Sequence, residues 1–473
     1  MSVEWIDSGR HPYERAVVIG GGIAGMLTAR VLADYFREVT VIERDWRTAQ
    51  PAFRRGAPQG QHAHLLLDTG ARILERYFPG IRASLLQAGA TNLNAGLDIR
   101  HIADGIRRPE YASEFSALAI SRPVLEWHLA ERLRQLPNID IVQGSAVRKL
   151  DYTEDRISGV HLTPGPSRFD RQYLSANLVV DASGRGTTTP ATLLDCGFER
   201  PRESVLSQDT IYVSRIFRIP SGQRRWKALL AQSGERGASV VPMDRDHWLV
   251  TLQGPKGEHP PLDDSGFMQF AQDLPVPELH QALNESEAIT DASAMRTMTH
   301  VRRHYEDLRR FPEGLLVLGD ALCDLPPSQH RGMTIAILQA QMLQDCLEQR
   351  TLRRQPIGQL WRDFFRHCST TIDTCWQLAT LQNDAREAHR SDLRWRFMHR
   401  YLREIQTAVG RDVRVAEHWV ATIHRIEPLR TLLSARVIGS LISGSPSNAV
   451  PVAYEIEDKD TTLIRAQRTG WTR

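Results

Sequence analysis

A glycine-rich turn between an apolar run and a helical segment is the feature that most constrains how this chain folds. The apolar residues Ala-Val-Val-Ile lead directly into Gly20, Gly22 and Gly25. A segment of helical character follows, and a second β-branched run ends at Glu43. Strand, tight turn, helix and strand within about 30 residues predict a βαβ nucleotide-binding unit.

Each glycine in this turn has a separate expected task. Gly20 permits the tight turn, Gly22 lets the backbone approach a pyrophosphate, and Gly25 allows the helix to pack on the strand. Glu43 stands 18 positions after Gly25, close to the spacing of about 20 expected for a carboxylate that accepts ribose hydroxyls. Such an acid would repel a 2′-phosphate, so the tightly held dinucleotide is not expected to be NADP. We also predict that Arg44, the residue after Glu43, contacts the cofactor. The alternative to dinucleotide binding is that the glycines form a purely structural turn.

Other segments alternate between strand and helix patterns along the chain. The expected helices are residues 65–78, 121–136, 332–349 and much of 359–444, and the expected strands include residues 139–142, 160–163, 178–181, 210–219, 239–242, 247–252 and 314–318.

Composition excludes several classes of protein. The 473 residues include 59 Lys and Arg against 56 Asp and Glu, a net charge of +3, so no overall field recruits nucleic acid. Five scattered cysteines without a C-x-x-C pair argue against a disulfide framework and against a metal site. We find no signal peptide and no apolar run long enough to span a membrane, so a soluble, cytoplasmic protein is expected.

Three separated motifs together resemble the flavoprotein monooxygenases with the para-hydroxybenzoate hydroxylase type of fold. The first is the glycine turn with Glu43, the second is Asp181-Ala-Ser-Gly-Arg-Gly186, and the third is Gly319-Asp320 with Gly332-Met333 beyond it. The resemblance implies that the first motif holds the adenosine diphosphate of FAD. It implies that Asp181 lies near the pyrophosphate, that Arg185 is placed for NAD(P)H contact, and that Asp320 holds the ribityl chain. A turn or helix-capping aspartate is the alternative for Asp320.

The third motif also makes physical sense on its own. A buried strand delivers a carboxylate to a polyol at Gly319 and Asp320, and a helix then begins near Gly332 and Met333. The positive end of that helix would face the flavin and stabilise its reduced, anionic form.

A closer likeness is to the bacterial group that contains polyether-pathway polyene epoxidases. It is carried by Ala57-Pro-Gln-Gly-Gln-His-Ala-His64 and by Ser121-Arg-Pro-Val-Leu-Glu-Trp-His128. The resemblance implies that Arg122 contacts the FAD phosphate or ribityl region. The alternatives are that Arg122 pairs on a helix surface, and that His62 and His64 merely cap or pack.

The loop after Gly319-Asp320 departs from the family pattern where the chemistry would occur. An inner glycine is replaced by His330 and the usual glutamine by Arg331, while Pro327 and Gly332 remain. A glycine there permits positive φ, which His adopts at greater cost. We treat Pro327, His330 and Arg331 as the flavin-adjacent catalytic loop. Arg331 either stabilises reduced flavin, anchors an anionic substrate, or simply faces solvent.

The predicted fold class is α/β: a Rossmann-type FAD-binding domain with an inserted β-sheet substrate domain and a helical C-terminal region. Residues 1–200 and 301–350 are assigned to the FAD-binding domain and 201–300 to the substrate domain. A helical cap occupies 351–450, and a polar tail occupies 451–473.

The predicted function is an FAD-dependent monooxygenase that hydroxylates or epoxidises a largely apolar secondary metabolite. The resemblance implies dioxygen activation through a flavin C4a-hydroperoxide, with NAD(P)H or a partner flavin reductase as the electron donor. The altered loop keeps open an oxidase, a dehydrogenase or a non-oxygenating cyclase, and a flavin-bound binding protein is a third possibility. Flavin halogenases resemble this fold but carry a Trp-x-Trp-x-Ile segment, and no two tryptophans of this chain stand two positions apart, so halogenation is disfavoured.

Overall fold

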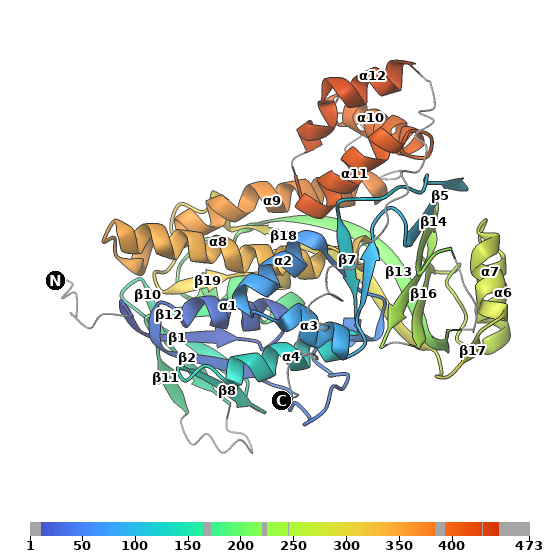
Figure 1. Ribbon diagram of the computed structural model, residues 1–473. Helices are drawn as coiled ribbons and strands as arrows, with labels where there is room; N and C mark the ends of the chain where they lie inside the picture. The colour runs from blue at the N-terminus through green and yellow to red at the C-terminus, as the bar shows by residue number, and fades with distance from the viewer. Residues whose placement is uncertain are drawn as a thin grey trace, which may run out of the picture.

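The computed structural model describes residues 11–163, 172–219, 225–244, 246–383, 393–427 and 429–443. Two large sheets, the helices around them and a C-terminal group of helices make up this part of the chain (Figure 1). The arrangement confirms the predicted α/β fold class. The predicted polar tail, 451–473, lies outside the described residues.

A parallel sheet forms the first layer, with strand order β19-β12-β1-β2-β8. Residues 16–18 of the central strand, 39–42 of its neighbour and 178–180 on its other side are buried, and all but the partly polar Thr40 are apolar, as parallel strands covered by helices on both sides require. The bounds are β1 Tyr13–Ile19, β2 Phe36–Glu43, β8 Ile139–Gln143, β12 Leu178–Asp181 and β19 Leu315–Val317.

Helices α1 and α8 pack together against this sheet, with α2 and α9 against α8 (Figure 1). The helices of this region are α1 Ile23–Leu32, α2 Asp68–Tyr77, α3 Ile81–Gln87, α4 Arg122–Arg134, α5 Thr189–Asp195, α8 Gly332–Leu352 and α9 Leu360–Asn383. Two smaller sheets accompany them, formed by β3 Leu65–Leu67, β4 Thr91–Asn94 and β7 Ser116–Ala119, and by β9 Val147–Thr153, β10 Arg156–Leu162 and β11 Tyr173–Ser175.

The prediction of a helix over residues 65–78 is wrong for its first three residues. Leu65, Leu66 and Leu67 form strand β3, which pairs with β7, and the helix begins at Asp68. A short leucine run is compatible with either structure, and pairing with a distant strand decided it.

An eight-stranded mixed sheet forms the second layer, where the substrate domain was predicted. Helices α6 and α7 cover its outer face, with their own apolar core (Figure 1). The elements are β5 Ile99–Ala103, β6 Ile106–Arg107, β13 Arg202–Arg218, β14 Ala228–Ser233, β15 Arg236–Met243, β16 His247–Pro255, α6 Asp264–Gln272, α7 Pro277–Asn284, β17 Glu287–Ala288 and β18 Ser293–His304. The sheet therefore also takes strands β5 and β6 from a segment outside 201–300.

The C-terminal helices form a separate group that stands above α9 and beside β7 (Figure 1). They are α10 Leu393–Val409, α11 Val413–Arg425 and α12 Ala435–Ser443, and they share a core with Tyr111 and Phe115. Short 3₁₀ segments are η1 Pro58–Gln61, η2 Gly184–Gly186, η3 Tyr305–Asp307, η4 Gly319–Ala321, η5 Pro327–Gln329, η6 Ile357–Gln359 and η7 Leu429–Leu433. Among the described residues, no helix combines the length and apolar composition needed to cross a bilayer.

Candidate functional site

The carboxyl ends of the parallel strands bring the three sequence motifs to one edge of the sheet. Gly20 follows β1, Glu43 ends β2, Asp181 ends β12, and Gly319-Asp320 follows β19. The register places the last residues of β1, β12 and β19 side by side. Ligands of open α/β sheets bind beyond this edge. Residues far apart in the sequence therefore share one candidate site.

The first glycine turn has space for a side chain at Gly22 but none at Gly20 or Gly25. Gly20 has φ +101°, and a Cβ built on it would lie 2.5 Å from the Ala182 carbonyl oxygen. A Cβ on Gly25 would lie 1.8 Å from the Gly20 carbonyl oxygen, so only glycine fits there. No described atom lies within 4 Å of a Cβ built on Gly22. The turn is thus closed towards the sheet and open at Gly22, just before α1 begins.

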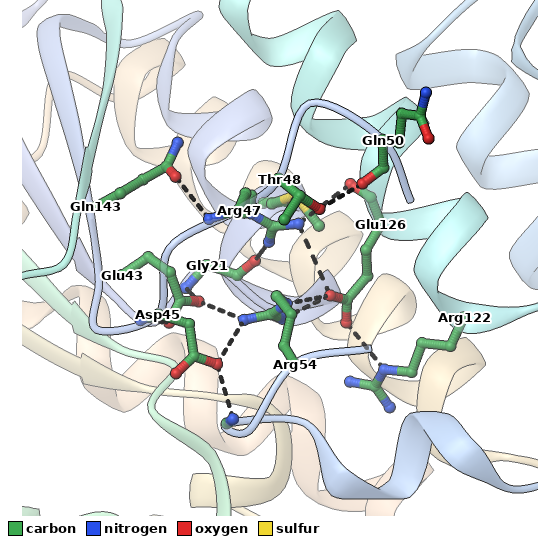
Figure 2. Close-up of polar contacts among 12 residues, drawn as sticks. Gly21, Glu43, Asp45, Arg47, Thr48, Gln50, Arg54, Arg122, Glu126 and Gln143 are labelled. Carbon is green, nitrogen blue, oxygen red and sulfur yellow. Dashed lines mark hydrogen bonds and ion pairs between the residues drawn. The ribbon is translucent and has the colours of Figure 1, made fainter. Parts of the chain in front are cut away.

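Glu43 is buried beside this turn and is held from two directions. Its Oε2 accepts a hydrogen bond from the Gly21 N–H at 3.0 Å, and its Oε1 accepts one from the Asp45 N–H at 2.9 Å. Arg54 Nη1 lies 3.0 Å from the same Oε2 (Figure 2). Arg44, the next residue after the strand, is exposed. Glu43 is therefore fixed at the edge where a ribose was predicted, whereas Arg44 points outward.

Glu126 on α4 is the centre of a buried network of arginines (Figure 2). Its carboxylate accepts from Arg54 Nη2 at 2.5 Å and Arg54 Nε at 3.0 Å, and from Arg122 Nε at 2.9 Å. Arg47 Nη1 lies 3.8 Å away. Burial alone would raise the pKa of Glu126, but the charges of Arg122, Arg54 and Arg47 outweigh it and lower that pKa.

Three residues of this network, Arg47, Arg54 and Glu126, were not predicted from the sequence, and the fourth, Arg122, was only partly placed. Arg54 and Glu126 are far apart in the chain, and the only local signal is the i, i+4 spacing of Arg122 and Glu126 on one helix face. Arg122 does pair on its helix, but within a largely buried cluster that reaches Glu43 through Arg54. Its predicted contact with the cofactor stays a prediction.

The Asp181 carboxylate accepts hydrogen bonds that hold the turn of the second motif. Its Oδ1 accepts from the Ser183 N–H at 2.9 Å and the Ser183 hydroxyl at 2.5 Å. Its Oδ2 accepts from the hydroxyls of Thr187 and Thr189. These bonds fix the turn at Gly184, where no described atom lies within 4 Å of an added Cβ. Asp181 therefore acts on the candidate site indirectly, by fixing the conformation of this turn.

Arg185 bridges the second motif to the loop after the third. Its Nε lies 3.0 Å from Asp324 Oδ2, and its Nη2 donates to the Thr299 carbonyl oxygen at 2.8 Å. His300 Nδ1 lies 2.9 Å from the same Asp324 oxygen, and the His300 side chain is fully buried. Asp324 therefore ties two of the motifs together, a role that no local pattern predicted.

Asp320, in contrast, makes no hydrogen bond or ion pair with any residue that the structure describes. Its side chain is half-buried beyond β19. Desolvation and, to a lesser degree, the neighbouring charge of Asp324 raise its pKa to about 6, against the opposing charges of Arg122 and Arg185. An unpartnered carboxylate in this setting is suited to accept hydrogen bonds from hydroxyl groups of a ligand.

The altered loop adopts the conformation that glycine would favour. His330 has φ +52° and ψ +25°, in the left-handed region. Its Nε2 lies 3.3 Å from the Ser239 hydroxyl on β15. Pro327 begins the half-buried η5, and Met333 is buried in the first turn of α8. The predicted strain at His330 is thus present, and the sheet contact helps to hold it.

Arg331 occupies the N-cap position of α8 and is only 4% exposed. The alternative of a solvent-facing arginine is therefore wrong. No Cβ added to the next residue, Gly332, would meet a described atom within 4 Å, so the start of α8 borders open space.

His62 and His64 serve the structure. His62 is buried, its Nδ1 lies 2.7 Å from the Ser214 hydroxyl, and burial lowers its pKa to about 4. His64 Nδ1 lies 2.6 Å from the His62 carbonyl oxygen. These contacts favour the packing interpretation over a catalytic one.

Comparison with known proteins gives one family and several similar folds. The sequence profile of the FAD binding domain family matches residues 14–350. The chain is 32% identical over 379 residues to protein Rv3254 of Mycobacterium tuberculosis (strain ATCC 25618 / H37Rv), covering 78% of this chain and 80% of that protein.

Solved structures resemble the fold at low sequence identity. PqsL of Pseudomonas aeruginosa, described as a probable FAD-dependent monooxygenase, gives a TM-score of 0.60 at 18% identity over 79% of this chain and 97% of its own. The flavin-dependent brominase Bmp2 gives 0.62 at 14% identity over 84% and 92%. The oxygenase of 2-methyl-3-hydroxypyridine-5-carboxylic acid gives 0.57 at 17% identity over 79% and 93%.

Proposed function

Because the chain belongs to the FAD binding domain family and is an FAD-dependent oxidoreductase, we propose that it is a monooxygenase acting on a largely apolar secondary metabolite. The reaction would be hydroxylation or epoxidation, the latter suggested by the closer likeness to polyene epoxidases. The observation that carries the proposal is the unpartnered Asp320 at the same sheet edge as the open glycine turn.

The residues at this edge fit FAD. The open position at Gly22 would admit the pyrophosphate, and Glu43 would accept ribose hydroxyls. Asp320 would accept hydroxyls of the ribityl chain, and the start of α8 at Gly332 would face the flavin ring. Bound FAD would supply the two-electron activation of dioxygen from which one oxygen atom reaches the substrate.

The chain's own task would be orientation and exclusion of water. The loop Pro327–Gly332 joins the cofactor edge to β15 through the His330–Ser239 contact. This contact would hold the loop between FAD and the second sheet, which we propose as the substrate platform. Pro327, His330 and Arg331 would then border the reacting atoms.

The electron donor is either NAD(P)H or a partner flavin reductase. Arg185 keeps 43% of its side chain exposed while its Nε is tied to Asp324. That combination would allow a transient dinucleotide to reach the site from solvent. A cytoplasmic location is part of the same proposal, since all five cysteines are unpaired and four of them are buried.

A second candidate, an oxidase, a dehydrogenase or a non-oxygenating cyclase, is favoured by the altered loop. Its left-handed His330 and buried Arg331 replace residues that the resemblance would place against the flavin.

Labelled dioxygen separates the two candidates. Purified protein is loaded with FAD and supplied with NADH, NADPH or a flavin reductase, and product is examined for the heavy oxygen isotope. Incorporation of one labelled atom supports the monooxygenase. Unlabelled product formed at low oxygen would favour the second candidate, and a protein that cannot be reconstituted with FAD would refute both.

A further inference from the structure

A hollow lies between the segment of residues 46–54 and helix α4, next to the predicted cofactor edge. The helix contributes positions 123, 126, 127, 130 and 134, which recur every three or four residues and so share one face. The hollow holds about 410 Å³ of unfilled space when its open mouth is counted. Small-molecule sites commonly hold about 300–1,000 Å³. The hollow is therefore large enough to receive one part of an extended ligand from solvent.

The segment 46–54 is fixed at its start, in its middle and at its end. The Arg47 N–H donates to Gln143 Oε1 at 2.8 Å. The Ala49 carbonyl oxygen accepts from the indole N–H of Trp127 at 2.9 Å. At its end Arg54 belongs to the buried network of Figure 2. The hollow is thus built into the fold, because the segment that covers it is tied down along its length.

Three aromatic side chains line the hollow, those of Trp46, Phe53 and Trp127. Trp46 is 58% exposed and Phe53 is 45% exposed. The ring of Trp46 is held against Gly144, where an added Cβ would come within 2.4 Å of the indole. Aromatic surface that is fixed in place and open to water is suited to be covered by a planar ring of a ligand.

The same lining carries three arginines and one carboxylate. Arg54 is matched by Glu126 at 2.5 Å and by two carboxylates on its other side. Arg47 is less well matched, since its side chain is 8% exposed and its Nη1 lies 3.8 Å from a Glu126 oxygen. Arg134 pairs with Glu131, but both side chains are about two-fifths exposed, so this pair contributes little. An anionic group in the hollow would therefore meet positive charge at Arg47 and Arg134.

The hollow adjoins the predicted FAD edge without being part of it. Neither the glycine turn nor Glu43 is among the described residues that line it. Arg54 stands between the two places, with Nη1 lying 3.0 Å from Glu43 and Nη2 lying 2.5 Å from Glu126. A ligand in the hollow would thus lie beside FAD and would not take its place.

A series of contacts leads from the hollow towards the loop Pro327–Gly332. A Cβ built on Gly60 would lie 3.9 Å from the ring of Phe53, at the wall of the hollow. Two residues further on, His62 Nδ1 lies 2.7 Å from the hydroxyl of Ser214 on the second sheet. The loop contacts the same sheet. A long ligand with one end in the hollow therefore has a surface to follow towards the predicted flavin ring.

We propose that this hollow binds the adenosine phosphate end of the nicotinamide dinucleotide that reduces FAD. The inference rests on the proposed function and narrows its electron donor to NADH or NADPH. The adenine ring would cover the exposed aromatic side chains, and a phosphate would accept hydrogen bonds from Arg47 and Arg134. The donor gives up a hydride, which is two electrons with one proton, FAD accepts that hydride, and the oxidised dinucleotide leaves.

The test follows the reduction of the FAD-loaded enzyme without oxygen, read from flavin absorbance, at increasing concentrations of NADH or NADPH. ADP and 2′,5′-ADP are added as competitors. The variants are Trp46→Leu and Arg134→Gln, both at positions open to solvent. The matched controls are Tyr173→Leu, 40% exposed on β11, and Arg132→Gln, whose side chain points away from the hollow and donates to a backbone carbonyl oxygen. A fluorescence titration measures the FAD affinity of each protein.

The wild-type enzyme and both controls should show saturable reduction by one of the two dinucleotides, with competition by ADP or 2′,5′-ADP. Trp46→Leu and Arg134→Gln should each raise the half-saturating donor concentration about tenfold, since each loses one contact to the adenosine phosphate end. The loss should lie in that concentration and not in the limiting rate of reduction. The affinity for FAD should not follow it.

Unchanged donor affinity in both variants would overturn the inference. An equal weakening of FAD would assign the hollow to the adenosine of FAD itself and overturn it as well. Reduction by neither dinucleotide, together with reduction by a flavin reductase, would also overturn it and leave the proposed function standing. Labelled-oxygen incorporation with the reductase as donor then tests that function separately.

Discussion

Replacing Glu126 by glutamine would leave three arginines around a neutral amide. The carboxylate is 3% exposed and accepts three hydrogen bonds of 2.5–3.0 Å from Arg54 and Arg122. Removing one partner of a buried ion pair typically costs about 3–5 kcal/mol, because the remaining charge stays buried. A glutamine oxygen can still accept one bond, so the expected loss is about 3 kcal/mol of unfolding free energy.

The matched control is Glu131→Gln on the same helix. Glu131 pairs with Arg134, but both side chains are about two-fifths exposed, at 41% and 39%. Such pairs contribute about 0.2–1 kcal/mol. Urea unfolding followed by circular dichroism measures both variants without cofactor. A Glu126→Gln loss within about 0.5 kcal/mol of the control would refute the reasoning.

The difference in stability between the wild-type protein and Glu126→Gln should also depend on pH. The pKa of Glu126 is lowered below its ordinary 4.5 in the fold, so its stabilising effect is present above that pH and is lost as pH falls through the folded value. The wild-type advantage over Glu126→Gln should therefore shrink as the pH falls below the ordinary value of 4.5 and through the lowered pKa of the folded state. An advantage that stays constant from neutral pH to the acid limit of the folded protein would contradict the ionic network.

Three further outcomes follow from the same edge of the sheet. Gly25→Ala should cost about 3 kcal/mol of unfolding free energy without cofactor, since its Cβ would overlap a carbonyl oxygen, whereas Gly22→Ala should unfold like wild type and lose FAD affinity in a fluorescence titration. Asp320→Asn should weaken FAD about tenfold. It should also remove a decline in apoprotein stability between about pH 4 and about pH 6, because a pKa raised from 3.8 to about 6 makes the charged form unfavourable in the fold. His330→Gly should be more stable in urea than His330→Ala by about 1 kcal/mol, since both lose the side chain and only alanine keeps the left-handed strain. Equal stability of the paired variants, or an unaltered pH profile in Asp320→Asn, would contradict these expectations.

The sequence predicted well those features that are local. The turn at Gly20, its strand and its helix depend on neighbouring residues, and the apolar run of β19 before Asp320 is equally local. The order of these motifs along the chain was enough to predict the fold class. The left-handed backbone conformation of His330 could also be predicted, because this residue stands where the family has a glycine.

Features that depend on distant partners were not predicted. Nothing near Arg54 shows that it meets Glu126, and nothing near His101 shows that its strand joins a sheet formed mostly by residues 202–304. The burial of Arg331 likewise depends on helices that come later in the chain. Side-chain pairing and burial across such separations are set by tertiary packing, which no local pattern encodes.

Strand β19 is the edge strand of the parallel sheet, next to β12, but it comes late in the chain. This order has a consequence for the synthesis of the protein. The first βαβ unit leaves the ribosome early, but Asp320 follows Glu43 by 277 residues and the start of α8 at Gly332 follows it by 289. Domains begin to fold while the chain is still growing. A nascent chain can thus build the part of the site proposed for the adenosine long before the part proposed for the flavin exists. Retention of FAD should accordingly mark a chain that has been made at least as far as α8.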